Sequence, residues 1–484
     1  MIDVGSSSVR AAVLTDDGSL RHLSQRPIHV ASPAPGLVEV DGSEIGQVVI
    51  ELAVKTLEEA GPVQGVGIAN QRATTLVWER GSGELVGPGI GWQDLRTVGT
   101  CLGMQADGFR FPPNASATKL SWLLDQFDPE RVRAGELCFG TIDTWCAWVL
   151  SEGTVHATDA TNASVTALMT DDGRGWDGRV LEALHIPPEL LPDIVDSSGV
   201  IGEARGLPGA PPICGIAGDQ QASLFGQGCT RPGLAKATFG TGGMLDQCVG
   251  EMATGPIAQL APGGTFPLVA WRRRGRNVYA IEALMLSAGS CVDWLRDDIG
   301  IITDSSSSQQ IASRCQDTGG AWFVPALVGL GTPLWDFGAR GTLLGVTLGT
   351  GRAELVRAVL EGVAHRGADL LEAAETDSGQ RVSTLRVDGG MSANEVFVQA
   401  LANATGRPIE LSENIEATTM GAGLLAGLGA ALWRDEDETS AAYRPRRTVE
   451  PANTDSERVA ARERWFAVRE RALETIPELS AIKF

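Results

Sequence analysis

The sequence predicts an α/β protein built from two lobes, and three observations support this prediction. Near the start, the run from Ser8 to Leu14 is rich in β-forming and small residues and ends at an Asp-Asp-Gly turn signal, which indicates one strand of a hairpin. Later, residues 353–374 have the apolar periodicity of a long helix, and a short apolar run at residues 385–387 follows them. Between these parts, Gly226 to Gly233 is rich in Gly and Pro, and we place the boundary between the lobes there.

The length and composition fit this division. A chain of 484 residues has room for about three average domains, but large α/β lobes often exceed that size, so two remain the better prediction. The apolar fraction of 43% is enough for full hydrophobic cores. We therefore predict one domain over residues 1–228 and a second over residues 229–484.

The charge balance excludes some partners. The chain has 39 Lys and Arg against 60 Asp and Glu, a net charge of −21 that repels nucleic acids and anionic membranes. A bound nucleotide must then be held by local backbone N–H groups and Mg²⁺, because the overall field opposes it.

Cysteine and histidine usage indicates neither disulfides nor zinc. No two of the eight cysteines have CxxC spacing, and no two of the five histidines form an HxxxH pair, so we expect reduced core thiols and no zinc site. The chain opens without a basic and apolar leader, and no apolar run reaches the ~18 residues of a membrane span. We expect a cytoplasmic protein.

Three further elements follow from local patterns. Residues 74–84 indicate a second hairpin, and residues 116–124 have apolar side chains on one helical face. The charged stretch from Ser456 to Glu474 indicates an amphipathic helix with Ser456 as its N-cap.

A Ser-rich turn near the start has the composition of a phosphate-binding loop. In Gly5-Ser6-Ser7-Ser8, small residues let backbone N–H groups approach oxygens, and the hydroxyls add donors. Such turns are also typical of solvated loops, but Arg10 supplies a cation and Asp3 could hold Mg²⁺ through water. Only Met1 and Ile2 precede Asp3, so the apolar strand expected to hold it is nearly absent; either the chain begins too late or this edge is unusual.

Two Gly-rich turns lie further along the chain. Gly240-Thr241-Gly242-Gly243 separates two β-like runs, and Gly389-Gly390 ends a strand and opens a helix, where a flat nucleoside can lie on backbone without side chains. A plain hairpin and ordinary strand–helix packing are the alternatives. Walker GxxxxGK[ST] and a convincing GxGxxG are both missing from the sequence, so P-loop kinases and nicotinamide dehydrogenases fit poorly.

One carboxylate has the surroundings of a base. Asp219 stands beside Gln220 and Gln221 at the end of a Gly-rich segment, as a group that deprotonates a hydroxyl would. Two phosphate loops, a surface for a nucleoside and a base together predict a phosphotransferase.

Several motifs then agree, in order, with one family. The chain resembles the FGGY family of carbohydrate kinases, and among them the glycerol kinases, over nearly its whole length. The resemblance implies the two-lobed, actin-like and Hsp70-like (ribonuclease H-like) ATPase fold with a central cleft for ATP and substrate. It rests on Asn70-Gln71-Arg72, Gly91-Trp92-Gln93-Asp94, Gly140-Thr141-Ile142-Asp143-Thr144-Trp145, Gly218-Asp219-Gln220-Gln221, Gly329-Leu330-Gly331-Thr332-Pro333, Val387-Asp388-Gly389-Gly390 and the helix that carries Glu354, Leu355 and Glu361.

The resemblance also implies a role for each matching residue. Asp219 corresponds to the catalytic base, and the acceptor contacts are Arg72, Trp92 and Gln220. The β- and γ-phosphate positions are Ser6, Ser7, Ser8 and Arg10, with Thr241 on the second loop, and the nucleoside positions are Gly289, Gly390 and Asn394. Asp293 replaces a Gln that the family places near the purine.

Three positions depart from the glycerol kinases, and all three lie at the acceptor. Ala73 replaces a Glu that accepts from substrate hydroxyls, Asn114 replaces an aromatic residue in a signature that keeps Ser116, Lys119 and Trp122, and Met244 replaces a Phe beside the carbon chain. We expect a pocket that is roomier and less negative than a glycerol pocket.

The resemblance implies ATP-dependent phosphorylation of a primary hydroxyl on a small polyol or sugar, with ATP and Mg²⁺ as cofactors. It allows a homodimer or homotetramer. Two alternatives stay open: a kinase for a longer C4–C6 polyol or ketose, and, outside enzymes, a nucleotide-gated binding protein of the actin or Hsp70 kind.

Overall fold

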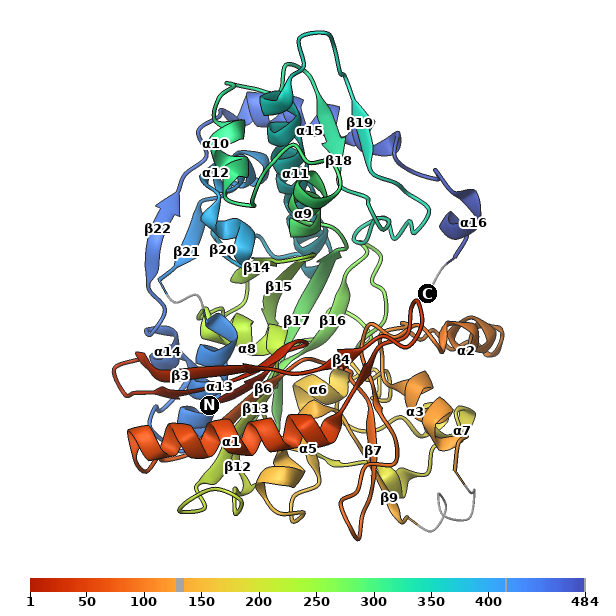
Figure 1. The fold of residues 1–484 in the computed structure, drawn as a ribbon, viewed down its shortest axis with the longest axis vertical. Coiled ribbons are helices and arrows are strands. Elements are labelled where there is room, and N and C mark those ends of the chain that lie inside the picture. Colours follow the sequence, from red (N-terminus) through yellow and green to blue (C-terminus); the bar gives the residue numbers. More distant parts are fainter. Residues whose placement is uncertain (128–134, 414–415, 483–484) are drawn as a thin grey trace.

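Two mixed sheets, one in each lobe, organise the chain (Figure 1). The computed structural model describes residues 1–127, 135–413 and 416–482. The six-stranded sheet of the first lobe has the strand order β12 (Ser198–Glu203), β13 (Pro212–Gly218), β6 (Val66–Asn70), β1 (Ile2–Val4), β2 (Ser8–Leu14) and β3 (Leu20–Pro27). Strands β1, β6 and β13 are parallel, and β2 and β3 form the predicted hairpin.

The strand that holds Asp3 is short but complete enough to place it. Although β1 has three residues, it pairs with β2 on one side and β6 on the other, and all three residues are buried. The Met1 ammonium donates to the Ala12 carbonyl at 2.7 Å, and burial lowers the pKa of this amine to about 6. The strand is as short as the sequence indicates, and pairing on both sides compensates for its length.

Helices from distant parts of the chain cover the two faces of this sheet. On one face, Ile2, Ile68 and Ile216 pack with α1 (Gly42–Ala60) and α5 (Ile142–Leu150). On the other face, Ala69 and Ala217 pack with α8 (Asp219–Gly226) and α13 (Ala417–Gly429). The alternation of side chains along each strand separates the two sets.

Helices α8 and α13 cross closely enough to require glycine. A Cβ on Gly421 would lie 1.7 Å from the Ala222 carbonyl oxygen, and one on Gly226 would lie 2.1 Å from that of Ala417. Because α13 comes from the second half of the sequence, the first lobe is completed by residues far beyond Gly226.

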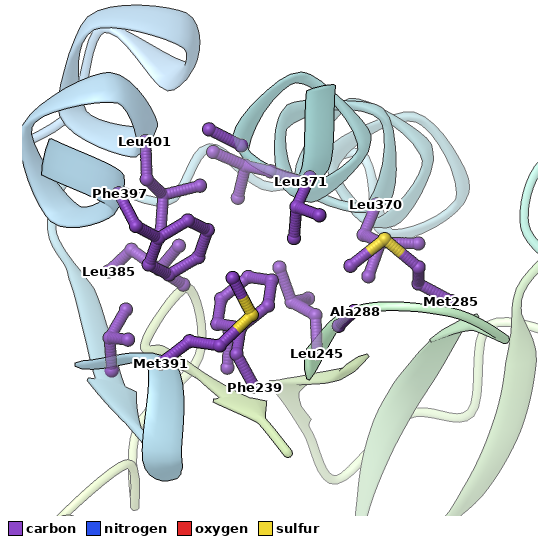
Figure 2. Close-up of a cluster of buried hydrophobic side chains, with 14 of the residues drawn as sticks. Phe239, Leu245, Met285, Ala288, Leu370, Leu371, Leu385, Met391, Phe397 and Leu401 are labelled. Atoms are coloured by element: carbon purple, nitrogen blue, oxygen red, sulfur yellow. The ribbon is translucent and has the colours of Figure 1, made fainter. Parts of the chain in front are cut away.

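The second lobe is a seven-stranded sheet. One face packs beneath α11 (Arg352–Ser378) and α12 (Glu395–Thr405): Figure 2 shows Phe239 and Leu245 from the sheet facing Leu370 and Leu371 of α11 and Phe397 of α12. The strands are, in sheet order, β16 (Phe266–Arg273), β17 (Arg276–Met285), β15 (Gly243–Gly250), β14 (Ala235–Phe239), β20 (Leu385–Asp388), β21 (Ile409–Ser412) and β22 (Pro445–Val449).

The remaining elements are small. The strand sets are β4 (Val30–Ala31), β5 (Glu39–Val40) and β8 (Gly89–Ile90); β7 (Leu76–Glu79) and β9 (Leu137–Gly140); β10 (Ala157–Asp159) and β11 (Asp193–Val195); and β18 (Trp322–Val324) and β19 (Thr342–Leu344). The helices are α2 (Val98–Gly103), η1 (Met104–Asp107), α3 (Ala117–Leu124), α6 (Ala160–Ser164), α7 (Gly178–Ala183), η2 (Pro188–Leu190), α9 (Gly289–Asp297), α10 (Ser307–Ala312), η3 (Gly390–Ala393), α14 (Glu436–Ser440), α15 (Asp455–Glu470) and α16 (Pro477–Ser480).

The sequence predicted the type of a local element more reliably than the residues at which the element begins and ends. Helix α3 confirms the prediction for residues 116–124. The second hairpin is reduced to one bridge between Trp78 and Leu85, because β7 pairs with β9 instead. Helix α15 is capped by Thr454 and not by Ser456: Thr454 Oγ1 accepts from the Glu457 N–H at 3.3 Å, and the Glu457 carboxylate accepts from the Thr454 N–H at 2.8 Å.

All eight cysteines are free thiols, and all except Cys315 are buried. Within the described ranges, no helix is long and apolar enough to cross a membrane.

Candidate active site

Three loops of the first lobe meet at one edge of its sheet. The parallel strands β13, β6 and β1 are neighbours, so their carboxyl ends lie side by side. Asp219 follows β13 directly, Arg72 follows β6 by two residues, and the turn around Ser6 follows β1. Parallel pairing thus brings together a carboxylate, a cation and a hydroxyl-rich turn that are far apart in sequence.

Asp219 is the first residue of α8 and is partly accessible. Its Oδ1 accepts from the Gln220 N–H at 2.8 Å and lies 3.5 Å from Arg72 Nε, while 31% of the side chain is exposed. Burial raises the pKa of Asp219 above its ordinary value, against the lowering effect of Arg72. A carboxylate with a raised pKa is a better proton acceptor than an ordinary aspartate.

Arg72 joins the two lobes beside Asp219. Its Nη2 lies 2.6 Å from Glu282 Oε2 on β17, and its Nη1 donates to Gln221 Oε1 at 3.4 Å. The guanidinium is therefore shared between Glu282 of the second lobe and Asp219 of the first. Although Ala73 stands where the family has a Glu, Arg72 still has an anionic partner, because Glu282 supplies a carboxylate from the opposite lobe.

Gln220 is held from the second lobe as well. Its Oε1 accepts from Lys236 Nζ at 2.6 Å, and Lys236 is in turn 2.8 Å from Asp246 Oδ2. Sequence reasoning missed Lys236, Asp246 and Glu282. A signal was present: each is a charged residue inside a β-run of apolar neighbours, where a buried charge needs a partner.

Trp92 contacts the Ser-rich turn that follows β1. Its indole Nε1 donates to Ser6 Oγ at 3.1 Å. Beneath it, the buried Lys119 donates to the carbonyls of Gly91 at 2.9 Å, Trp92 at 3.0 Å and Asn114 at 3.3 Å. Burial lowers the pKa of Lys119 to about 7. Lys119 thus fixes the backbone of Trp92 and Asn114.

The three serines of the first turn differ in availability. Ser7 is exposed at the turn, which the Gly5 N–H closes by donating to the Ser8 carbonyl at 2.9 Å. The Ser8 hydroxyl is buried and accepts from Gln25 Nε2 on β3 at 2.9 Å. Ser7 therefore offers the free surface of this turn, Ser6 accepts from Trp92 and keeps its own hydroxyl proton to donate, and Ser8 supports the turn from β3.

Asp3 lies buried behind the turn. Its Oδ2 is 3.4 Å from Arg10 Nη1 and accepts from Thr419 Oγ1 at 3.2 Å. Burial raises the pKa of Asp3 to about 6, with Arg10 opposing and the nearby Asp219 adding to the rise. In the part of the chain that the structure describes, no group of three or more His, Cys, Asp or Glu side chains is arranged to hold a metal.

The second lobe contributes two Gly-rich turns at one sheet edge. Strands β14 and β20 are parallel neighbours, so Gly240 and Gly389 follow adjacent carboxyl ends. Both approaches need glycine: a Cβ on Gly389, which has φ +88°, would lie 2.5 Å from the Phe239 carbonyl oxygen, and one on Gly289 would lie 2.5 Å from that of Gly240. The Thr241 side chain is exposed, and Gly390 faces open space.

The predicted nucleoside residue Asn394 and the replacement residue Asp293 are both engaged elsewhere. Asn394 caps α12, because its Oδ1 accepts from the N–H groups of Val396 at 3.0 Å and Phe397 at 3.1 Å, while its Nδ2 donates to Ser308 Oγ at 3.0 Å. Asp293 on α9 pairs with Arg296 at 3.0 Å.

The three departures have different surroundings. Ala73 is buried in the left-handed region at φ 60°, and its carbonyl accepts from Ser116 Oγ at 3.1 Å. Asn114 is exposed. Met244 is half-buried on the same face of β15 as Asp246, two residues further on.

Comparison with known proteins identifies the relatives of this chain. Residues 1–226 match the N-terminal domain of the FGGY family of carbohydrate kinases, and residues 236–430 match the C-terminal domain of that family. A glycerol kinase of Aromatoleum aromaticum is 42% identical over 97% of this chain and 98% of its own. A second, glycerol kinase 2 of Thermotoga maritima, is 39% identical over 98% of both chains.

Solved structures agree on the fold. Plasmodium falciparum glycerol kinase with ADP superposes with a TM-score of 0.90 at 29% identity, covering 100% of this chain and 98% of that one. A Brucella ovis structure described as a xylulose-type kinase reaches a TM-score of 0.85 at 23% identity over 100% and 99% of the two chains, and supports the fold alone. These similarities confirm the predicted two-lobed α/β fold.

Proposed function

The chain belongs to the FGGY family of carbohydrate kinases and is a phosphotransferase with an alcohol group as acceptor, and from that premise we propose that Asp219 activates a primary hydroxyl of a small polyol. The observation that carries the proposal is the position of Asp219, partly exposed at the start of α8 between Arg72 and Gln220. Its raised pKa suits a group that must take a proton as the hydroxyl attacks phosphorus.

The nucleotide would occupy the edge where the Gly-rich turns lie. Backbone N–H groups and the hydroxyls of Ser6, Ser7 and Thr241 suit phosphate oxygens, and the side-chain-free surface at Gly390 suits a flat base. Arg10 stands beside Asp3 and can balance phosphate charge.

Mg²⁺ fits this site with the nucleotide as its main ligand. Asp3 offers a buried carboxylate near Asp219, whose charge contributes to the raised pKa of Asp3, and it would hold the ion through water. When bound, the ion would neutralise charge on the transferring phosphoryl oxygens.

We propose that the acceptor is a polyol longer than glycerol. If glycerol itself is accepted, we expect this pocket to bind it more weakly than the pocket of a glycerol kinase does. The relatives named glycerol kinases are similar over their full length, and Arg72, Trp92 and Gln220 are kept, which supports a polyol. Ala73, Asn114 and Met244 support the longer C4–C6 alternative, because each change removes a group expected to close on a three-carbon acceptor. We further propose that the domains divide at residues 228 and 229, with α13 returning to the first lobe.

An ATPase-coupled assay over C3 to C6 polyols and ketoses tests this proposal. Glycerol should be a weaker substrate than a longer acceptor. The double change Ala73→Glu and Asn114→Tyr should raise kcat/KM for glycerol by about 10–150-fold, since a hydrogen bond to a charged group is worth about 1.5–3 kcal/mol.

Two outcomes would revise the proposal. If glycerol exceeds every longer acceptor in kcat/KM before any substitution, the enlarged-pocket argument is wrong. If no acceptor stimulates ATP turnover while ATP still binds, a nucleotide-gated binding protein is the better description.

A further inference from the structure

Three charged side chains form a row across the second sheet. Lys236 on β14 stands opposite Asp246 on β15, and Asp246 stands opposite Glu282 on β17. Residues opposite each other on neighbouring strands point to the same face, so the three side chains are adjacent. Their exposed fractions are 0%, 1% and 8%. The opposite face carries the apolar core of Figure 2, so the charged row faces the first lobe.

Both ends of this row hold a side chain of the first lobe. At one end, Glu282 lies 2.6 Å from Arg72, and at the other, Lys236 donates to Gln220 at 2.6 Å. Arg72 and Gln220 are the two residues that flank the base Asp219. The row thus fixes the groups on both sides of Asp219 from the opposite lobe.

The central residue of the row is poorly compensated. Apart from its ion pair with Lys236, neither oxygen of Asp246 has a hydrogen-bond partner among the described residues. A buried ion pair of this kind is often no more stabilising than apolar side chains of similar size. Stability alone therefore does not account for it, whereas fixing the Lys236 ammonium towards Gln220 does.

We propose that Lys236, Asp246 and Glu282 are positioning residues for the acceptor, a role that rests on the function proposed above. Glu282 orients the guanidinium of Arg72, and the Lys236–Asp246 pair orients the carboxamide of Gln220. Because the row belongs to the second lobe and its two targets to the first, the acceptor groups are aligned only while the lobes are together.

Glu282→Gln tests one end of the row. The change keeps the size and removes the charge that holds Arg72, so KM for the best acceptor should rise about tenfold or more, while KM for ATP stays within twofold. In an Arg72→Ala background, Glu282→Gln should have no further effect on the acceptor KM.

The other end is tested by Lys236→Met combined with Asp246→Leu. Removing both charges avoids leaving one unpaired, so the protein has a route to fold even if Lys236→Met alone does not. A loss of about 10–100-fold in kcat/KM for the acceptor is expected, and the same double change should cost nothing more in a Gln220→Ala background.

Glu375→Gln is the matched control, because it breaks the ion pair with Arg407 at 3.0 Å in the same lobe, outside the site. It should lower stability without changing either KM. Effects of the row variants that persist in the Arg72 and Gln220 backgrounds, or that equal those of the control, overturn the positioning role. An unsubstituted protein that phosphorylates no polyol overturns the proposed function instead, so the two failures are distinguishable.

Discussion

Two clusters of buried charge in this molecule are built in opposite ways. Between α11 and α15, the carboxylate of Asp369 lies 2.6 Å from Arg366, 2.6 Å from Arg462 and 2.9 Å from Arg469, and it accepts from Trp465 Nε1 at 3.0 Å. These three cations outweigh the effect of burial and hold the pKa of Asp369 at about 2.

The cluster in the cleft has the reverse balance. Three carboxylates, Asp219, Asp246 and Glu282, share two cations, Arg72 and Lys236. Burial raises the pKa values of Asp219 and Glu282 above their ordinary values, against the lowering effect of Arg72 on both.

The difference separates a structural charge from a reactive one. A carboxylate with more cations than it needs has no affinity left for a proton and serves to join two helices. A group of carboxylates with too few cations retains that affinity, which is what a general base requires. Both Asp219 and Asp369 are shifted by burial, and it is the number of cationic partners that gives their pKa values opposite directions.

The strongest test of this comparison is Asp219→Asn. Removing the proton acceptor while keeping the size should lower kcat by about 10²–10⁴-fold and leave ATP binding intact. Steady-state kinetics and calorimetry measure the two effects. A variant that keeps more than half of the original kcat would show that Asp219 is not the base.

Asp369→Asn should have the opposite signature. Three arginines would lose their shared anion, and breaking a buried pair costs about 3–5 kcal/mol of unfolding free energy. Urea unfolding measures this loss. The folded fraction should keep its KM for both substrates, and a change in acceptor KM without a loss of stability would contradict the structural assignment.

The stability of the cluster around Asp369 should depend on pH through His365. Its ring stacks on Trp465 with centroids 5.2 Å apart, and burial with Arg462 nearby lowers its pKa to about 3. Because the unfolded chain has an ordinary pKa near 6.5, the unfolded state binds a proton first as pH falls. Stability should therefore fall by about 2 kcal/mol between pH 7 and pH 5 through this group.

The matched variant for that measurement is His365→Phe, which keeps a ring on Trp465. The unfolding free energy of the unsubstituted protein minus that of the variant should decrease as pH falls from 7 to 5. The contributions of all other titrating groups are the same in both proteins and cancel in this difference. If the two plots of unfolding free energy against pH are parallel, His365 does not contribute to the pH dependence.

The smallest expected effect comes from an uncharged side chain in the cleft, Thr241. Thr241→Val removes one hydroxyl donor from the proposed phosphate turn and should weaken ATP binding by about 0.5–1.5 kcal/mol. Calorimetry with ATP measures it, and an unchanged affinity would place the phosphates elsewhere.

Motif-bearing turns were predictable from the sequence, whereas partners across the lobes were not. The turns at Ser6, Asp219 and Thr241 lie at strand ends, where Gly and small residues give a local signal. Nothing local states that Glu282 pairs with Arg72, some 210 residues away, since that contact depends on how two sheets face each other. The N-cap of α15 was missed for a different reason: Thr454 and Glu457 form a capping box, a local signal that the choice of Ser456 overlooked.

The return of α13 to the first sheet sets the order in which the chain can mature during synthesis. About 190 residues separate the end of α8 from α13, and a ribosome adds about 5–20 residues per second, so the face with Ala69 and Ala217 stays without its α13 cover for roughly 10–40 s. During that interval the nascent first lobe exposes apolar surface to the cell. Chaperone dependence of newly made chains would therefore originate at this face and end when residues 417–429 emerge.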